Sequence, residues 1–437
     1  MAQSEATSAP AFSTTYRSYA LGLLTCVYVL NFVDRQIVVI LQESIRIDLG
    51  LMDWQLGLLS GFAFAIFYCT LGIPIARLAD RGNRSTIIAA SVAVWSLMTA
   101  LCGTVQVFWQ LLLARIGVGV GEAGCSPPAH SIISDLYPPE RRSTALSIYN
   151  MGIYIGVFFG YLAGGWLDQV LGWRIAFLAV GLPGVLIALI VKTTLREPPR
   201  GLSERVEIAS ATVPPAAAAP LKAVFLELWN RRSFRHLSVA AGLHAFVGYG
   251  AGNWMPPFLA RAHGMESGEI SLWLGPIAAV CGAGGAFLGG VLTDRYGIRD
   301  ARWYIWIPAG AIVASVPLQL FVYTWPDPVV ALLVYTVPVV LGAMYLGPML
   351  AMVHGMVEPR MRAFASSILF FVLNLIGLGL GPLVTGILSD TLAVSLGLAD
   401  GLRWALIIVT LANVWCVVHY LLGAKTLKTD LLARPDA

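Results

Sequence analysis

The feature that most constrains this chain is its series of long apolar runs, separated by short polar segments. Most runs reach about 20 residues or more, the length that an α-helix needs to cross the hydrocarbon core of a bilayer. Hydrophobic residues make up 57% of the sequence and charged residues only 12%, too few to cover a soluble globular surface. A membrane β-barrel would require short alternating strands, and that pattern is absent from the sequence. The sequence therefore predicts an all-α polytopic membrane protein.

Twelve transmembrane helices are predicted along the chain. We expect them at about 19–41, 54–79, 85–106, 108–134, 143–167, 173–195, 237–259, 270–292, 303–324, 328–353, 363–388 and 402–423. Segment 196–220 contains Pro214-Pro215 and an alanine run, which is typical of a flexible linker. Apolar residues then recur at helical spacing, which predicts a short amphipathic helix in the membrane interface; an ordinary start to the seventh span is the alternative.

The spans divide the chain into five parts. We expect a disordered N-terminus (1–16), a six-helix bundle (17–195), a linker with the amphipathic helix (196–234), a second six-helix bundle (235–424) and a tail (425–437). An even number of spans places both termini on one side. With both termini in the cytoplasm, 22 of the 28 Lys and Arg residues lie on that side and four lie outside (Arg46, Arg174, Arg261 and Arg403). This positive-inside bias predicts cytoplasmic termini in a bacterial-type inner membrane.

The two predicted bundles repeat each other in sequence. Three pairs of segments match in the same order, at offsets of 214, 220 and 221 residues: 76–84 with 290–299, 139–147 with 359–367, and 160–165 with 381–386. Three matches in register indicate a duplicated six-helix unit. The sequence therefore predicts two pseudo-symmetric halves.

Four charged residues lie well inside the predicted spans, away from their ends. Asp34 and Arg35 are adjacent in the first span, and Arg115 and Glu122 lie two turns apart in the fourth. A charge at the bilayer centre costs at least about 2.5 kcal/mol, so such residues usually face one another or a transport pathway. At a rise of about 1.5 Å per residue, Asp34 and Arg115 come to similar depths in the membrane. Two acids and two bases at this depth can form a neutral set that takes up one proton.

This set suggests a proton-coupling site. Burial raises the proton affinity of a carboxylate and a nearby arginine lowers it, so movement of the partner changes proton binding. We hypothesise that Asp34 carries the proton, with Arg35 or Arg115 as alternating partners, and that Glu122 contributes. The alternative is a static buried salt bridge between the first and fourth spans, and for Glu122 a structural role is equally compatible with the sequence.

Two short loops carry a second charged pattern. Asp80 could cap the N-terminus of the eleventh span near 363–366, and Asp294 could do the same for the fifth span near Ser143, because free N–H groups at a helix N-terminus attract an anion. Such contacts would latch the cytoplasmic side when the carrier opens outward, and a solvated turn is the alternative. The basic residues of the same loops belong to this predicted latch: Arg81, Arg84, Arg142, Arg295 and Arg362.

A mixed polar and aromatic cavity lining is predicted between the halves. Its candidate residues are Asn31, Tyr149, Asn253, Trp254, Tyr345 and Asn374, with core packing as the alternative for each. This mixture suits an amphipathic substrate with one polar head group, and the arginines suit an anionic one. The six cysteines show no CxxC spacing and the histidines are isolated, so we expect neither a metal site nor a cofactor. The sequence contains no cluster of nucleophile and base residues of the kind that an enzyme would need, so we do not expect an enzyme.

Several of these motifs resemble a known family. The loop at 76–84 looks like the signature of the major facilitator superfamily, and Arg115 with the small residues after it resembles the second motif of that family. The segments Asn31–Arg35 and Gly119–Ala123 together resemble its spinster branch. Ala76 stands where the loop signature usually has glycine, and Tyr161 stands where the antiporter motif has proline. The resemblance implies two six-helix halves that rock about a midplane cavity, and lipid-like substrates such as lysophospholipids or sphingoid lipids.

The expected protein is thus a proton-coupled secondary active transporter. It would move an amphipathic, lipid-like substrate by alternating access, driven by a proton gradient. Export of drugs or organic anions is the alternative within the same fold, and a lipid scramblase without proton coupling is the alternative from another class. We expect it to act as a monomer in the lipid bilayer, without nucleic acid.

Overall fold

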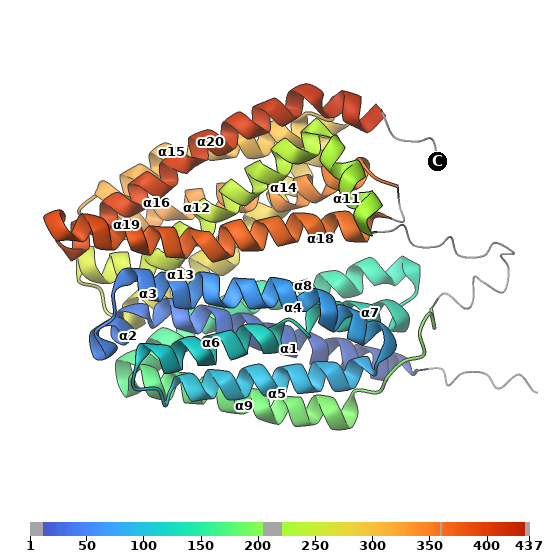
Figure 1. Ribbon diagram of the computed structural model, residues 1–437, viewed down its shortest axis with the longest axis horizontal. Coiled ribbons are helices and arrows are strands. Elements are labelled where there is room, and N and C mark those ends of the chain that lie inside the picture. Colours follow the sequence, from blue (N-terminus) through green and yellow to red (C-terminus); the bar gives the residue numbers. More distant parts are fainter. Residues whose placement is uncertain (1–11, 204–220, 359–360, 433–437) are drawn as a thin grey trace, which may run out of the picture.

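The computed structural model describes residues 12–203, 221–358 and 361–432, which form helices and no strand. Twelve passes run along the long axis of the molecule within this part of the chain, six in each half. The first half, blue to green, lies beside the second half, yellow-green to red (Figure 1). The beginning of α1 and the end of α20 lie at the same end of the bundle, which we call the terminal end. We call the other end, where α2 lies, the far end.

The first half contains six passes and one short helix at the far end. In chain order its elements are α1 (Thr14–Ile40), α2 (Gln42–Leu49), α3 (Asp53–Gly57), the π-helical η1 (Leu58–Phe62), α4 (Ala63–Arg81), α5 (Arg84–Cys102), α6 (Phe108–Glu122), α7 (Ser126–Leu136), α8 (Pro139–Leu171) and α9 (Trp173–Thr194). Caps define several of these starts: Ser13 accepts a hydrogen bond from Tyr16 N–H at α1, and Asn83 accepts one from Thr86 N–H at α5.

The second half follows the same plan after an additional short helix. Its elements are α11 (Leu221–Asn230), α12 (Arg232–His263), α13 (Ser267–Pro276), the π-helical η2 (Ile277–Cys281), α14 (Gly282–Gly297), α15 (Trp303–Thr324), α16 (Pro328–Ala343), α17 (Leu346–Gly355), α18 (Arg362–Val372), the π-helical η4 (Leu373–Leu380), α19 (Gly381–Leu396) and α20 (Leu398–Leu432). The fourth pass of each half is broken, between α6 and α7 and between α16 and α17.

Ten helices among the described residues are long and apolar enough to cross a membrane. The other two passes fall short for different reasons. The α6–α7 pass is interrupted at residues 123–125, where Pro127 and Pro128 begin a new helix. The α12 pass has the length but also carries His244, Asn253 and charged residues near both its ends. The all-α fold of twelve transmembrane helices in two halves is confirmed.

Three segments differ from the expected boundaries. The expected disordered N-terminus reaches residue 16, of which 1–11 lie outside the described residues, but α1 already begins at Thr14. The expected tail begins at residue 425, whereas α20 continues to Leu432, and its side chains Tyr420, Ala424 and Leu427 are buried at helical spacing. The expected flexible linker begins at residue 196, yet Glu197, Arg200 and Gly201 are hydrogen-bonded to the first half. Residues 204–220 of that linker lie outside the described part.

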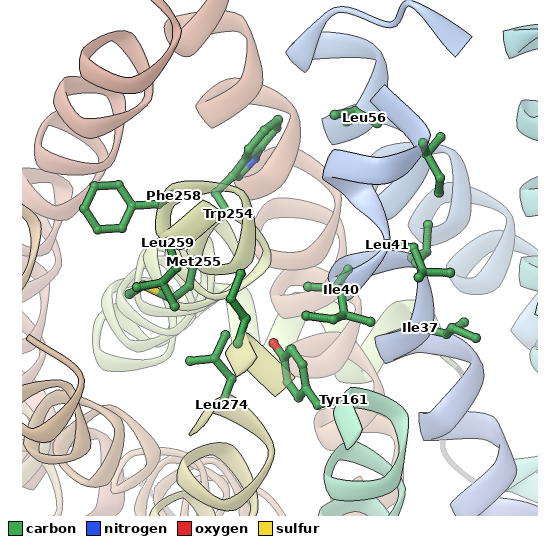
Figure 2. Close-up of a cluster of buried hydrophobic side chains, with 14 of the residues drawn as sticks. Ile37, Ile40, Leu41, Leu56, Tyr161, Trp254, Met255, Phe258, Leu259 and Leu274 are labelled. Atoms are coloured by element: carbon green, nitrogen blue, oxygen red, sulfur yellow. The ribbon is translucent and has the colours of Figure 1, made fainter. Parts of the chain in front are cut away.

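The buried apolar side chains form three clusters. One cluster lies in the first half and includes only Leu378 from the second, one lies within the second half, and the third is shared by both halves. Figure 2 shows the shared cluster, where side chains of α1 and α12 such as Ile40 and Met255 face each other and Tyr161 and Leu274 lie beside them. Apolar packing therefore joins the halves.

The halves come into backbone contact near the far end. A Cβ on Gly57 of α3 would lie 2.4 Å from the carbonyl oxygen of Pro382, and a Cβ on Gly165 of α8 would lie 2.5 Å from the Cβ of Ser271. Only glycine permits such an approach without displacement of the neighbouring backbone. The structure is therefore a state in which the far end is closed.

Candidate functional site

The charged residues of α1 and α6 form a buried site inside the first half. Arg35 Nε donates a hydrogen bond of 2.7 Å to Glu122 Oε2, and the Glu122 side chain is fully buried. Three aromatic rings surround the Arg35 guanidinium, with Cζ 4.8 to 5.1 Å from the ring centroids of Phe32, Phe64 and Tyr68. A cation held by a carboxylate and three ring faces is compensated without water. Arg35 and Glu122 therefore form the central ion pair of this site.

Asp34 lies in different surroundings from its neighbour Arg35. The residue is only 2% exposed and no ion pair to it occurs among the described residues. Arg115 and Glu122 act on it electrostatically, and the side chains of Trp95 and Thr99 lie beside it. The four charged groups thus lie together in the first half, but the ion pair joins Arg35 to Glu122 and leaves Asp34 without an ion pair among the described residues.

Several acceptors in this site have no hydrogen-bond donor among the described residues. Asp34 Oδ1, Glu122 Oε1 and Asn31 Oδ1 are buried without a partner. Arg115 makes only a long contact of 3.5 Å from Nε to the carbonyl oxygen of Leu59, and its Nη1 has no acceptor. A buried ionised oxygen without a donor is unfavourable, and a proton on the carboxylate removes that charge. The arrangement is chemically suited to bind a proton.

The predicted latch residues lie at the terminal end, and the structure places them differently from one another. The side chain of Asp80 lies outside the described part. Asp294 accepts a hydrogen bond of 2.9 Å from Tyr304 Oη of its own half. Arg81 and Arg295 are exposed, Arg362 is half-buried and Arg142 donates to Ser203 Oγ. A cytoplasmic latch stays a prediction, because this structure is closed at the other end.

Arg84 belongs to a buried network rather than to the boundary between the halves. It is 1% exposed, and it donates to Glu197 Oε1 at 2.6 Å and to the Pro198 carbonyl oxygen at 2.7 Å. It also forms an ion pair with Asp135. Both carboxylates belong to the first half or to the segment that follows it. Arg84 therefore anchors the start of the linker to the first half, which is the physical reason that this segment is ordered.

The six predicted cavity residues separate into two groups. Tyr345 lines a cavity of about 310 Å³ inside the second half. The other five do not line it. Trp254 is fully buried and donates to the Pro382 carbonyl oxygen at 2.9 Å, and Tyr149 is fully buried and stacks on Tyr28. Asn31 and Asn253 are buried, and Asn374 of η4 donates to the Phe370 carbonyl oxygen of the preceding α18.

A network between the halves was missed from the sequence. Arg261 of α12 donates two hydrogen bonds to the Asp53 carboxylate, at 2.7 and 2.8 Å, and a third to Glu43 at 2.8 Å. Ser389 Oγ donates to the same Asp53 carboxylate at 2.6 Å. These residues lie at the ends of the apolar runs, where charges are ordinary. The available signal is that an acidic residue adjoins both the start of the second span and the end of the eleventh.

Asp390 completes this network by capping a helix of the other half. Its carboxylate accepts hydrogen bonds from the backbone N–H groups of Asp53 and Trp54, at 3.0 and 2.8 Å. These are the first two residues of α3, whose N–H groups have no partner within the helix. A carboxylate at a helix N-terminus is also stabilised by the helix dipole. The far end is therefore closed by an ion pair and by a helix cap supplied in trans.

Comparison with known proteins agrees with this architecture. Residues 24–382 match the family model described as Major Facilitator Superfamily. An MFS-type efflux pump of Mycolicibacterium smegmatis is 33% identical over 413 residues, which cover 94% of each chain. Protein spinster homolog 1 of Mus musculus is 30% identical over 390 residues, which cover 85% of this chain and 72% of that protein.

Solved structures give the same result. A bacterial homolog of the human lysosomal transporter spinster, in an inward-facing and unoccupied conformation, superposes with a TM-score of 0.86 at 34% identity. The match covers 96% of this chain and 99% of that chain. The occupied inward-facing conformation of that homolog gives a TM-score of 0.84. With its spinster relatives and its duplicated six-helix halves, this chain belongs to the major facilitator superfamily.

Proposed function

We propose that this membrane transporter is a proton-coupled secondary carrier of an amphipathic, lipid-like anion, with Asp34 as the proton-binding residue. The observation that carries the proposal is the buried site of two acids and two bases, in which Asp34 Oδ1 and Glu122 Oε1 have no donor. When a carboxylate of this site takes up a proton, the set of two acids and two bases changes from neutral to net positive. Alternating access then couples that change to movement of the halves.

The anionic end of the substrate is assigned to Arg35. Its side chain is 17% exposed while that of Glu122 is fully buried, so the guanidinium is the reachable member of the pair. Its planar group suits a phosphate or carboxylate. Similarity to spinster proteins supports a lysophospholipid or sphingoid substrate, and similarity to an efflux pump supports export of organic anions or drugs as the second candidate.

The orientation is part of the proposal. Lys and Arg residues are concentrated at the terminal end, which supports cytoplasmic termini in a bacterial-type inner membrane. The far end then faces outward, and a closed far end makes this state inward-facing. The inward-facing conformation of the spinster homolog supports this assignment.

The test is uptake of a fluorescent lysophospholipid into proteoliposomes under an imposed pH gradient. Wild-type flux should follow the gradient, and Asp34→Asn, which keeps the shape but cannot ionise, should abolish the dependence. Glu140→Asn serves as the control, because Glu140 is an exposed acid at the start of α8. Wild-type flux that ignores the gradient would exclude proton coupling and leave a scramblase or uniporter, whereas absence of flux would exclude this lipid class and direct the assay to organic anions.

A further inference from the structure

The cavity inside the second half is lined by uncharged residues, in which polar and aromatic side chains alternate with small and aliphatic ones such as Val247, Ile312 and Val339. Its volume is about 310 Å³, and no Lys, Arg, Asp or Glu is among the residues that line it. The polar groups come from four passes: His244 and Tyr249 of α12, Ser315, Gln319 and Tyr323 of α15, Tyr335 of α16, and Asn413 of α20. Tyr345, at the break between α16 and α17, completes this set. We call this space the second-half cavity.

Two of these groups are buried without a hydrogen-bond partner in the part of the chain that the structure describes. Tyr323 is 1% exposed and its Oη has no partner, and His244 is 7% exposed and its Nδ1 has none. A plain alkyl chain in this space would leave both groups unsatisfied, which is unfavourable for buried polar atoms. A hydroxyl or amide group would satisfy them. The lining therefore favours a hydrogen-bonding ligand group over a hydrocarbon one.

The break between α16 and α17 positions the His244 side chain in the cavity lining. His244 Nε2 lies 2.8 Å from the carbonyl oxygen of Gly342, in the last turn of α16, where carbonyl groups lack partners within the helix. The His244 ring also stacks on Tyr345, with the ring centroids 3.9 Å apart. Gly342 lies 220 residues after Glu122, which is within the range of offsets between the two halves. The second half thus has a glycine at the position equivalent to Glu122, and the backbone oxygen of that glycine contacts an imidazole instead of forming an ion pair.

Tyr249 links the second-half cavity to the charged site. It lines the cavity and packs against the buried clusters of both halves. It also lies within electrostatic reach of Arg35 and Tyr68. Tyr249 therefore lies between the second-half cavity, which it lines, and the charged site of the first half.

We propose that the second-half cavity is a neutral hydrogen-bonding subsite, which binds a hydroxyl- or amide-bearing group of a substrate whose anionic group lies at Arg35. This inference rests on the proposed function, because that function places the anion. It adds a selection rule: among anions of equal charge and chain length, the carrier binds those with an uncharged hydrogen-bonding group more tightly.

Two lysophospholipids with the same acyl chain test the rule. Lysophosphatidylglycerol and lysophosphatidylmethanol both carry one phosphodiester charge, and only the first has head-group hydroxyls. Binding to the purified protein in nanodiscs should be at least about tenfold tighter for lysophosphatidylglycerol, since each hydrogen bond contributes about fivefold or more. Tyr323→Phe should reduce this ratio about fivefold and leave lysophosphatidylmethanol binding unchanged.

Tyr420→Phe is the matched control. Tyr420 is also fully buried with an unpartnered hydroxyl, but it does not line the second-half cavity, so its removal should leave the ratio unchanged. Asn413→Leu provides a second cavity variant if Tyr323→Phe does not fold. Equal binding of both lipids by the wild type, or an unchanged ratio in both cavity variants, would overturn the subsite.

Failure of the proposed substrate class gives a different result. If neither lysophospholipid binds, the lipid assignment is wrong, and octyl glucuronide is then compared with dodecanoate. Both are amphipathic carboxylates and only the first carries hydroxyls. Preference for octyl glucuronide that is lost in Tyr323→Phe would support the subsite for organic anions, and no preference would overturn it.

Discussion

Adjacent residues at the centre of this protein have separate roles. Successive positions on a helix differ by about 100° in direction, so neighbours along the chain face different surroundings. Asp34 faces α5 and α6 inside the first half, whereas Arg35 faces the rings of Phe64 and Tyr68 on α4. The acid is therefore shielded and the base is partly reachable. In the proposed function, this division separates proton binding from anion binding by a single residue of sequence.

The planar shape of Arg35 should matter as much as its charge. Arg35→Lys keeps the positive charge but replaces a flat group by a compact ammonium, which stacks poorly on three rings. We expect loss of about 1–2 kcal/mol of stability and a transport rate at least about tenfold lower. Thermal unfolding in detergent and proteoliposome uptake measure the two effects. Arg299→Lys, at an exposed loop position, should change neither quantity. Normal transport by Arg35→Lys would show that the contacts of the guanidinium with the three rings are not needed.

The sequence predicted which charges meet, but not how they pair. Helical rise alone brings Asp34 and Arg115 to one depth, because rise per residue is nearly constant. The choice of Glu122 as the partner of Arg35 depends on helix rotation and on the aromatic rings of α4, which no local pattern specifies. The second-half cavity was harder still to predict. Tyr345 was among the predicted cavity residues, whereas Tyr323 resembles an ordinary core residue in sequence.

At the scale of single elements, glycine sets how closely α6 approaches α5. Gly121 precedes the buried carboxylate of Glu122, and a Cβ on it would lie 2.6 Å from the backbone nitrogen of Trp95. Backbone cannot move aside as a flexible side chain can. Gly121→Ala should therefore shift α6 and destabilise the fold by about 1–3 kcal/mol.

The control for this prediction is another helical glycine. Gly22→Ala adds the same methyl group on α1, where nothing lies within 4 Å of the new Cβ, and should be neutral or slightly stabilising. Thermal unfolding of both variants in one detergent gives the comparison. Equal unfolding temperatures would show that α5 and α6 tolerate separation, and that the close contact does not position Glu122.

At the scale of the whole molecule, a carboxylate of one half caps a helix of the other, but at the far end and not at the terminal end where the sequence suggested it. The sequence pattern suggested that carboxylates of one half cap helices of the other at the terminal end. The observed cap is at the far end, where Asp390 accepts the N–H groups of Asp53 and Trp54. The loop motif repeated at 76–84 and 290–299 predicted contacts at the terminal end, whereas Asp390 lies outside the repeated segments. Twelve helices and two halves follow from local apolar runs and a repeat, but the contact between the halves does not.

This cap should control how often the far end opens. Asp390→Asn removes the charge and leaves one oxygen to accept two N–H groups, which should cost about 1.5–2 kcal/mol and raise the open population roughly tenfold. Ser271→Cys reports opening, because Ser271 is fully buried against α8 in the closed state. Its labelling rate by a thiol reagent, in a background without the native cysteines, should rise about tenfold.

The matched control is Asp327→Asn, since Asp327 caps α16 through Val330 N–H at 2.9 Å within the second half alone. Equal labelling rates in the two variants would show that the ion pair of Asp53 with Arg261 closes the far end without the cap. Faster labelling only in Asp390→Asn would show that a helix cap supplied in trans sets the balance between the two states of the carrier.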